Sequence, residues 1–192
     1  MRKSSEGRAA SGEAQGALSP VVEVVRTYLE LRSRQQLRPS TLTDPNTHIV
    51  RRDAITVDHY RRLYRSVGER WHWHDRDAWS DERLAAHLAS PSITVWECLV
   101  GNVSAGFFEL ERQHDGSVEI AYFGLVPEFI GRGLGKALLT RAAEEAWALL
   151  PSRVWLHTCT LDSPMALPNY RARGFEPVKT ETFVMQIEDT ET

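Results

Sequence analysis

A glycine-rich turn is the segment whose residue types and spacing are best suited to chemistry. Residues 130–136 read Ile-Gly-Arg-Gly-Leu-Gly-Lys and lie between a β-prone run and an apolar stripe with helical spacing. Backbone N–H groups that converge at the start of a helix bind phosphate oxygens, and glycine allows the close approach and the positive φ angles that this needs. Lys136 or Arg132 can add positive charge. The turn therefore predicts a phosphate-binding site, with a plain strand-to-helix connection as the alternative.

Spacing excludes the two commonest phosphate-binding motifs. A P-loop needs glycine where Ile130 stands and Ser or Thr where Ala137 stands. The dinucleotide fingerprint needs glycine at Lys136 if it starts at Gly131, or at Leu138 if it starts two residues later. Neither pattern is present, so the kind of phosphate ligand has to be inferred from the rest of the chain.

A second candidate segment, residues 71–79, combines tryptophan, histidine and aspartate. Two histidines two residues apart suggest a metal site, but no distant partners with ligand spacing are visible, so we expect no metal. Aromatic faces attract a cationic amine and carboxylates hold its charge, which predicts the wall of a substrate pocket. The alternative is a small local core. The residues of this segment are Trp71, His72, Trp73, His74, Asp75, Asp77 and Trp79.

The remaining reactive side chains are one histidine and two cysteines in apolar, β-prone runs. His157 can serve in a proton relay, although a histidine in such a strand is more often a hydrogen-bonded core residue. Cys98 and Cys159 have the surroundings of buried free thiols. We therefore expect neither a disulfide nor a zinc site.

The hydrophobic pattern indicates which elements position these residues. Apolar residues recur at helical spacing in three places, and β-rich runs separated by short turns precede and follow them. The predicted helices are 56–67, a segment from Ser80 to before Pro91, 134–149 and 164–173. The predicted strands are 21–31, 48–52, 93–100, 104–111, 118–126, 153–160 and 178–187. The third to fifth strands form an antiparallel meander, and we expect the first two to pair as a hairpin.

Two spaced motifs now resemble the GNAT superfamily of N-acetyltransferases. The glycine turn, preceded by Val126-Pro127-Glu128, is similar to the family signature (Arg or Gln)-x-x-Gly-x-(Gly or Ala), with Gly133 and Gly135 at the glycine positions. Residues 166–175 are similar to the Ala-x-x-x-Tyr-x-x-x-Gly-Phe ending of the last GNAT helix. The order of elements over about residues 20–187 also matches. The departure is Ile130, where the family usually has Arg or Gln.

The resemblance implies a fold and a cofactor site. It implies an α/β (α+β) GNAT fold with a central mixed, mostly antiparallel twisted sheet of about six to seven strands and about four helices. The turn is then expected to hold the pyrophosphate of acetyl-CoA through backbone N–H groups, with the pantetheine arm along residues 123–126. The implied cofactor-binding residues are Phe123, Leu125, Val126, Ile130, Gly131, Arg132, Gly133, Leu134, Gly135, Lys136 and Asn169.

The resemblance also implies catalytic roles. Glu119 falls where the histone-acetylating branch of the superfamily has its general base, with a solvated strand glutamate as the alternative. Tyr170 matches the tyrosine that usually protonates the coenzyme A thiolate, with packing as the alternative. No cysteine lies in either motif, which predicts direct acetyl transfer to an amine. A non-catalytic acyl-CoA-binding or regulatory module is the other function that we consider, and Ile130 is the feature that favours it.

Bulk properties restrict the class of protein and its partners. The chain has 192 residues and a net charge of -3, so one domain without an overall basic field is expected. No apolar stretch approaches a membrane span or a signal peptide. We expect a cytoplasmic enzyme with a small-molecule or peptide amine acceptor, no nucleic-acid or membrane partner, and a homodimer left open. The expected layout is a disordered tail at 1–17, one acetyltransferase domain at 18–188 and a short tail at 189–192.

Overall fold

The computed structural model describes residues 21–186, which form one seven-stranded sheet with two helices on each face. The predicted tails lie outside these residues. The strands are β1 (Val21–Leu31), β2 (Thr47–Arg51), β3 (Ile93–Val100), β4 (Val103–Arg112), β5 (Val118–Leu125), β6 (Val154–Cys159) and β7 (Glu176–Gln186). The helices are α1 (Val57–Gly68), α2 (Asp81–Leu88), α3 (Leu134–Ala148) and α4 (Ala166–Ala172). Three short 3₁₀ turns are Arg34–Gln36, Glu69–Trp71 and Pro127–Phe129.

The strand order is β2-β3-β4-β5-β6-β1-β7, and every neighbouring pair is antiparallel except β5 and β6. This confirms the predicted mixed, mostly antiparallel sheet. The predicted hairpin of the first two strands is wrong, because β1 lies between β6 and β7 while β2 pairs with β3. A run of β-branched residues predicts a strand but does not identify its partner, and neither edge of β1 is left free.

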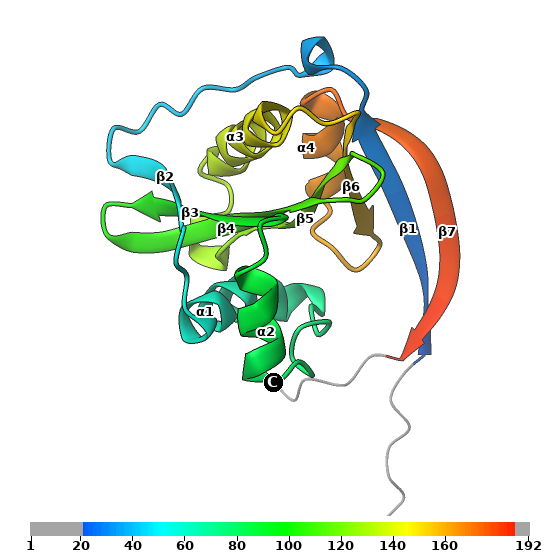
Figure 1. Cartoon of the computed structure of the whole chain (residues 1–192). Coiled ribbons are helices and arrows are strands. Elements are labelled where there is room, and N and C mark those ends of the chain that lie inside the picture. The colour runs from blue at the N-terminus through cyan, green and yellow to red at the C-terminus, as the bar shows by residue number, and fades with distance from the viewer. Residues whose placement is uncertain (1–20, 187–192) are drawn as a thin grey trace, which may run out of the picture.

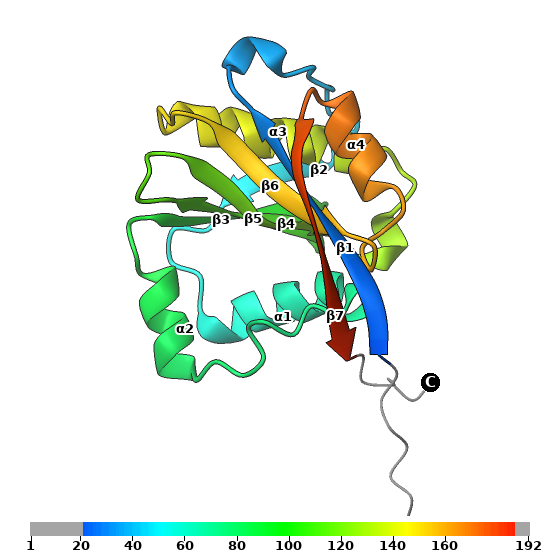
Figure 2. The same ribbon diagram turned by 90° about the vertical axis from the view of Figure 1, so that its right-hand side faces the viewer.

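The helices cover opposite faces of the sheet, as Figures 1 and 2 show. Helices α3 and α4 pack over the larger core, where the apolar stripe of α3 meets β4, β5 and β6. Helices α1 and α2 cover a smaller core on the other face. Each of these two helices has a serine or threonine N-cap: Thr56 accepts from the His59 N–H, and Ser80 accepts from the Arg83 N–H. No helix within residues 21–186 is long and apolar enough to cross a membrane.

Candidate active site

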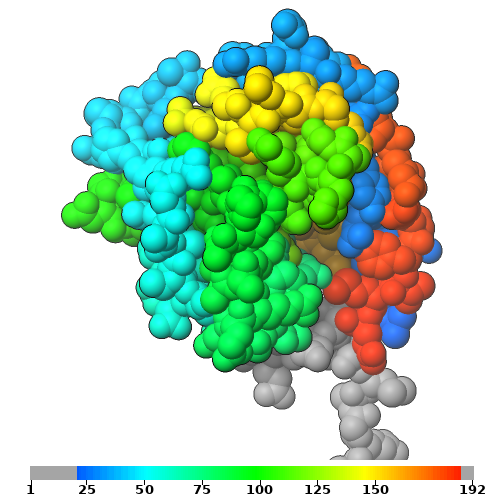
Figure 3. Space-filling view, in the orientation of Figure 1, coloured from blue at the N-terminus to red at the C-terminus, as the bar shows by residue number. Residues whose placement is uncertain are grey.

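A cavity of about 1180 Å³ opens where β5 and β6 separate. These parallel strands pair at only two positions, Val118 with Val154 and Glu119 with Trp155, and diverge beyond them. Residues from the glycine turn, α4, the loop after α1, and β1 and β7 also line the cavity. In the space-filling view a recess opens between β1 and β7, in blue and red, and the green segments that include α2 (Figure 3). The cavity therefore reaches both faces of the sheet through the divergence of two strands.

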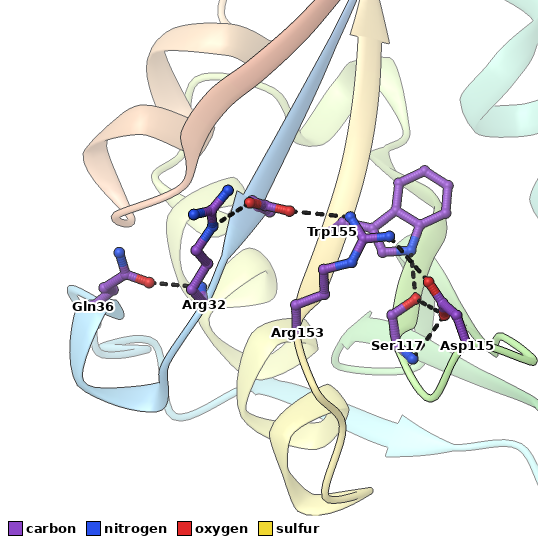
Figure 4. A network of polar contacts seen from close by, with 7 residues as sticks. Arg32, Gln36, Asp115, Ser117, Arg153 and Trp155 are labelled. Carbon is purple, nitrogen blue, oxygen red and sulfur yellow. Dashed lines mark hydrogen bonds and ion pairs between the residues drawn. The ribbon is translucent and has the colours of Figure 1, made fainter.

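A polar network joins β1, β6 and the β4–β5 turn beside the positions where β5 and β6 still pair (Figure 4). The Arg153 guanidinium, just before β6, donates to Glu30 of β1 at 3.0 Å and to Asp115 of the β4–β5 turn at 3.1 Å. The indole N–H of Trp155 donates to the Ser117 hydroxyl at 3.1 Å. Three segments that are far apart in the sequence are thus joined beside the last paired residues of β5 and β6. This arrangement fixes the point at which the strands begin to diverge.

The glycine turn presents a row of free backbone donors. Gly131 and Gly133 have φ angles of 84° and 80°, a region that disfavours residues with a side chain. Helix α3 begins after Gly133 without a side-chain cap and without an acidic residue in its first turn. Among the described residues, no protein group accepts a hydrogen bond from the N–H groups of 131–136. The turn therefore has both the donors and the helix N-terminus that an anionic phosphate needs.

Three of the implied cofactor residues do not line the cavity, although the backbone N–H groups of two of them, Arg132 and Leu134, have no acceptor among the described residues. The Val126 N–H donates to the Ala105 carbonyl at 2.9 Å, and the Arg132 guanidinium lies over the Phe129 ring. The Leu134 side chain is buried in the larger core. The other implied cofactor residues line the cavity: Phe123, Leu125, Ile130, Gly131, Gly133, Gly135, Lys136 and Asn169. The cofactor prediction is therefore supported mainly by backbone groups and by the side chains of β5.

Helix α4 brings Tyr170 and Asn169 to the same cavity. The Asn169 amide donates to the Gly135 carbonyl at 3.2 Å, which ties α4 to the first turn of α3. The Tyr170 side chain is 6% exposed and packs edge-on against Phe123 and Phe175. Its hydroxyl has no hydrogen-bond partner among residues 21–186, and burial holds its pKa well above the usual value. This phenol is therefore protonated at neutral pH and has its hydrogen-bonding capacity free.

Glu119 lies at the point where β5 and β6 begin to diverge. Its carboxylate accepts a hydrogen bond from the Gln113 amide at 2.9 Å, and His157 Nε2 lies 4.0 Å from its other oxygen. Burial, with the nearby carboxylates Glu111 and Glu109, raises the pKa of Glu119 to about 7. A carboxyl group that titrates near neutrality and faces a cavity is suited to accept a proton from an amine.

Part of the segment 71–79, which follows α1, forms one wall of the cavity. Trp71, Trp73 and Asp75 line the cavity, whereas Trp79 and Asp77 lie outside it. Trp73 also packs against Tyr64, Phe107 and Tyr122. The two interpretations of this segment are therefore not exclusive, because the same indole ring fills the smaller core and faces the cavity.

Sequence reasoning missed the residue that anchors this wall. Arg76 is 6% exposed, donates to Glu109 at 2.8 Å and lies over the rings of Trp79 and Tyr122. Glu109 is fully buried, accepts a hydrogen bond from the Tyr60 hydroxyl and lies 2.9 Å from His87 Nε2. A signal was present in the sequence, because a glutamate directly after Phe107-Phe108 in a β-prone run requires a buried partner.

Two expectations about single side chains are wrong. His157 is not a core residue, since its side chain is 37% exposed and lines the cavity. Cys159 is only partly buried and lines the cavity, while Cys98 is buried as expected. Burial and the nearby Asp162 raise the pKa of the Cys159 thiol, which disfavours the thiolate. Both residues follow the alternation of β6, but the divergence of β5 exposes the face that a continuous sheet would cover.

Comparison with known families identifies the fold as well as the motifs. Residues 57–175 match the acetyltransferase (GNAT) family. The chain belongs to this family. The match includes the glycine turn, Glu119 and Tyr170, and the seven-stranded sheet with four helices is the GNAT fold. The expected family and fold class are thereby confirmed.

Solved structures of GNAT proteins share the fold at low sequence identity. A GCN5-related N-acetyltransferase from Kribbella flavida matches with a TM-score of 0.59 and 16% identity, over 85% of this chain and 58% of its own. Another from Sphaerobacter thermophilus matches with a TM-score of 0.59 and 18% identity, over 87% and 51%. An aminoglycoside acetyltransferase from an uncultured soil metagenomic sample matches with a TM-score of 0.56 and 18% identity, over 68% and 88%. The chain thus spans little more than half the length of the first two. No curated protein matches the sequence.

Proposed function

We propose that the protein transfers the acetyl group of acetyl-CoA directly to a primary amine, as an acyl-CoA N-acyltransferase of class EC 2.3.1.-. One observation carries this proposal: a single cavity contains the glycine turn, Tyr170 and Glu119. The free N–H groups of the turn fit a pyrophosphate, and Lys136 adds a positive charge beside them. Acetyl-CoA would supply an activated acyl group, and the residues of the chain would position it and move protons.

The strand backbone and two side chains divide the chemistry. On the side facing β6, β5 has no ladder partner beyond Glu119, so backbone N–H groups near Phe123 or Leu125 can stabilise the oxyanion that develops on the acyl carbonyl. Glu119 accepts the proton of the amine, and Tyr170 donates a proton to the departing thiolate. The raised pKa of the Cys159 thiol favours direct transfer over a covalent cysteine intermediate.

The charges at the acceptor end of the cavity favour an amine that carries a second positive charge. Glu111 faces Glu119 directly across β4 and β5, an unfavourable pairing of like charges. Within the described part of the chain, neither of these carboxylates nor Asp75 has a Lys or Arg within 4 Å. Tyr122, Trp71 and Trp73 add aromatic faces. We therefore propose a dicationic amine as the acceptor.

A panel of amines tests this function. Transfer from acetyl-CoA would be measured by thiol release with hexylamine, 1,6-diaminohexane, spermidine, L-lysine, kanamycin and a lysine-containing peptide. We expect kcat/KM for 1,6-diaminohexane to exceed that for hexylamine by about tenfold or more, since one hydrogen bond to a charged group contributes about 1.5–3 kcal/mol. No transfer to any amine, together with tight coenzyme A binding, would instead support the non-catalytic acyl-CoA-binding module.

The role of Glu119 predicts a definite pH dependence. Because the pKa of Glu119 is raised to about 7, the fraction of Glu119 present as the carboxylate increases as the pH rises through 7. Turnover should rise over the same range. Glu119→Gln should lower turnover about 100-fold and flatten this limb of the profile. A profile of kcat against pH from 5.5 to 9 checks this, and an unaltered limb in the variant would remove Glu119 from this role.

A further inference from the structure

His157 has a position that the proposed chemistry has not yet used. It lies in β6 opposite Tyr28 of β1, whose ring packs edge-on at 5.7 Å and orients the imidazole. The Tyr28 hydroxyl donates to Glu181 of β7 at 2.7 Å, which holds the tyrosine in place. The His157 side chain is 37% exposed and lines the cavity. The imidazole is therefore held on one side and open to solvent on the other.

The Glu119 carboxylate is oriented towards this imidazole. Gln113 donates to Oε2 of Glu119 at 2.9 Å, and Oε1 is the oxygen that faces His157 Nε2 at 4.0 Å. A separation of 4.0 Å is closed by one bridging water or by a small rotation of either side chain. One carboxylate oxygen is therefore fixed by an amide, while the other is free to exchange a proton with the imidazole.

The surroundings of the two groups raise the pKa of Glu119 and keep the His157 imidazole available as a proton acceptor. Around Glu119, the carboxylates Glu111 and Glu109 raise its pKa and Arg76 lowers it, with burial as the largest cause of the rise to about 7. Around His157, burial and Arg26 lower its pKa, whereas Asp162 and Asp75 raise it, and the net direction is downward. His157 is thus mainly neutral at pH 7 and has a nitrogen available to accept a proton.

A base inside a cavity has to lose its proton before the next turnover. Glu119 is 14% exposed at its side chain, so its direct access to bulk water is poor, and the acceptor amine is expected to occupy the space in front of it. His157 is the more exposed neighbour on the opposite side of the divergence.

We propose that His157 relays to solvent the proton that Glu119 takes from the acceptor amine. An amine N–H bond breaks as a Glu119 O–H bond forms; that proton then passes to His157 Nε2, and the imidazolium releases one proton to bulk water. Glu119 returns to its carboxylate form, and the Tyr170 phenolate that remains after protonation of the thiolate takes up one proton from water, so no net charge accumulates. This inference rests on the proposed acetyl transfer and on Glu119 as its base.

Rescue by a small buffer base distinguishes a relay from a structural role. Steady-state transfer, in which Glu119 must lose its proton in every cycle, would be followed with the amine from the panel above that the wild-type protein acetylates fastest. His157→Ala should slow transfer about tenfold or more at pH 7 without weakening coenzyme A binding, and added imidazole should restore the rate in proportion to its concentration. Glu119→Gln should show no such rescue, because its first proton acceptor is missing. His114→Ala, an exposed histidine in the β4–β5 turn, is the matched control and should behave as wild type.

Each other outcome overturns the inference in a recognisable way. An unchanged rate in His157→Ala, or a slow rate that imidazole does not restore, shows that the histidine relays no proton. Rescue of His157→Ala combined with normal turnover of Glu119→Gln shows that His157 acts on the amine itself. If the wild-type protein acetylates none of the amines in the panel, the proposed function itself is overturned. That result is distinguishable from those above, in which the wild-type protein is active.

Discussion

Tyr170→Phe should lower turnover by about 100-fold or more while leaving coenzyme A affinity unchanged. Tyr170 lines the cavity, and its hydroxyl is protonated at neutral pH, has a pKa raised by burial, and has no hydrogen-bond partner among the described residues. Phenylalanine preserves the ring contacts with Phe123 and Phe175, so the change removes the proton donor with little effect on packing. Thiol-release kinetics measure the turnover, and isothermal titration measures the affinity.

A variant of the glycine turn is the control for Tyr170→Phe, because it should lower the affinity for coenzyme A, which the tyrosine variant leaves unchanged. Gly133→Val should weaken coenzyme A binding by about tenfold or more, since the φ of 80° costs a β-branched residue about 1–2 kcal/mol and the turn would reorient its N–H groups. No atom lies within 4 Å of an added Cβ there, so the effect would be conformational and not steric.

Unchanged turnover in Tyr170→Phe would show that another group protonates the thiolate.

Glu109→Gln should lower the free energy of unfolding by about 3–5 kcal/mol. Glu109 is fully buried and pairs with Arg76, which is 7% exposed at its side chain. The amide removes the countercharge and leaves the buried guanidinium without an ion-pair partner among the described residues, with the rings of Trp79 and Tyr122 against it. Because Arg76 attaches the loop after α1 to β4, the same change should loosen the wall that carries Trp73 and Asp75.

Chemical denaturation measures this stability loss, and a surface pair supplies the matched control. Asp53 pairs with Arg51, and their side chains are 76% and 50% exposed. Asp53→Asn should therefore change stability by no more than about 1 kcal/mol. A loss of less than about 1 kcal/mol in Glu109→Gln would show that the buried pair contributes no more than the exposed one.

Most of the elements could be predicted from the sequence because local signals determine them. The spacing of apolar residues in α1 and α3, the capping residues Thr56 and Ser80, and the turns of the meander are all properties of short segments. The glycine turn was recognisable for the same reason, because Gly131 and Gly133 adopt positive φ angles within a few residues.

Long-range pairing and its consequences could not be predicted in this way. The position of β1 between β6 and β7 depends on partners more than a hundred residues away. The exposure of His157 and Cys159 follows from the divergence of β5, which no periodicity within β6 reveals. The Arg76–Glu109 pair joins a loop to a strand, so the sequence can indicate a buried Glu109 but does not identify Arg76 as its partner.

The insertion of β1 between two late strands has a consequence for how the chain is made. β1 leaves the ribosome more than a hundred residues ahead of its partners, which are residues 154–159 and 176–186. Until those residues are synthesised, both edges of this β-branched strand lack their native partners, a state that favours aggregation and engagement by chaperones. Closure of the sheet is therefore expected to be a late, slow step of folding, since a loop of more than a hundred residues must first be closed.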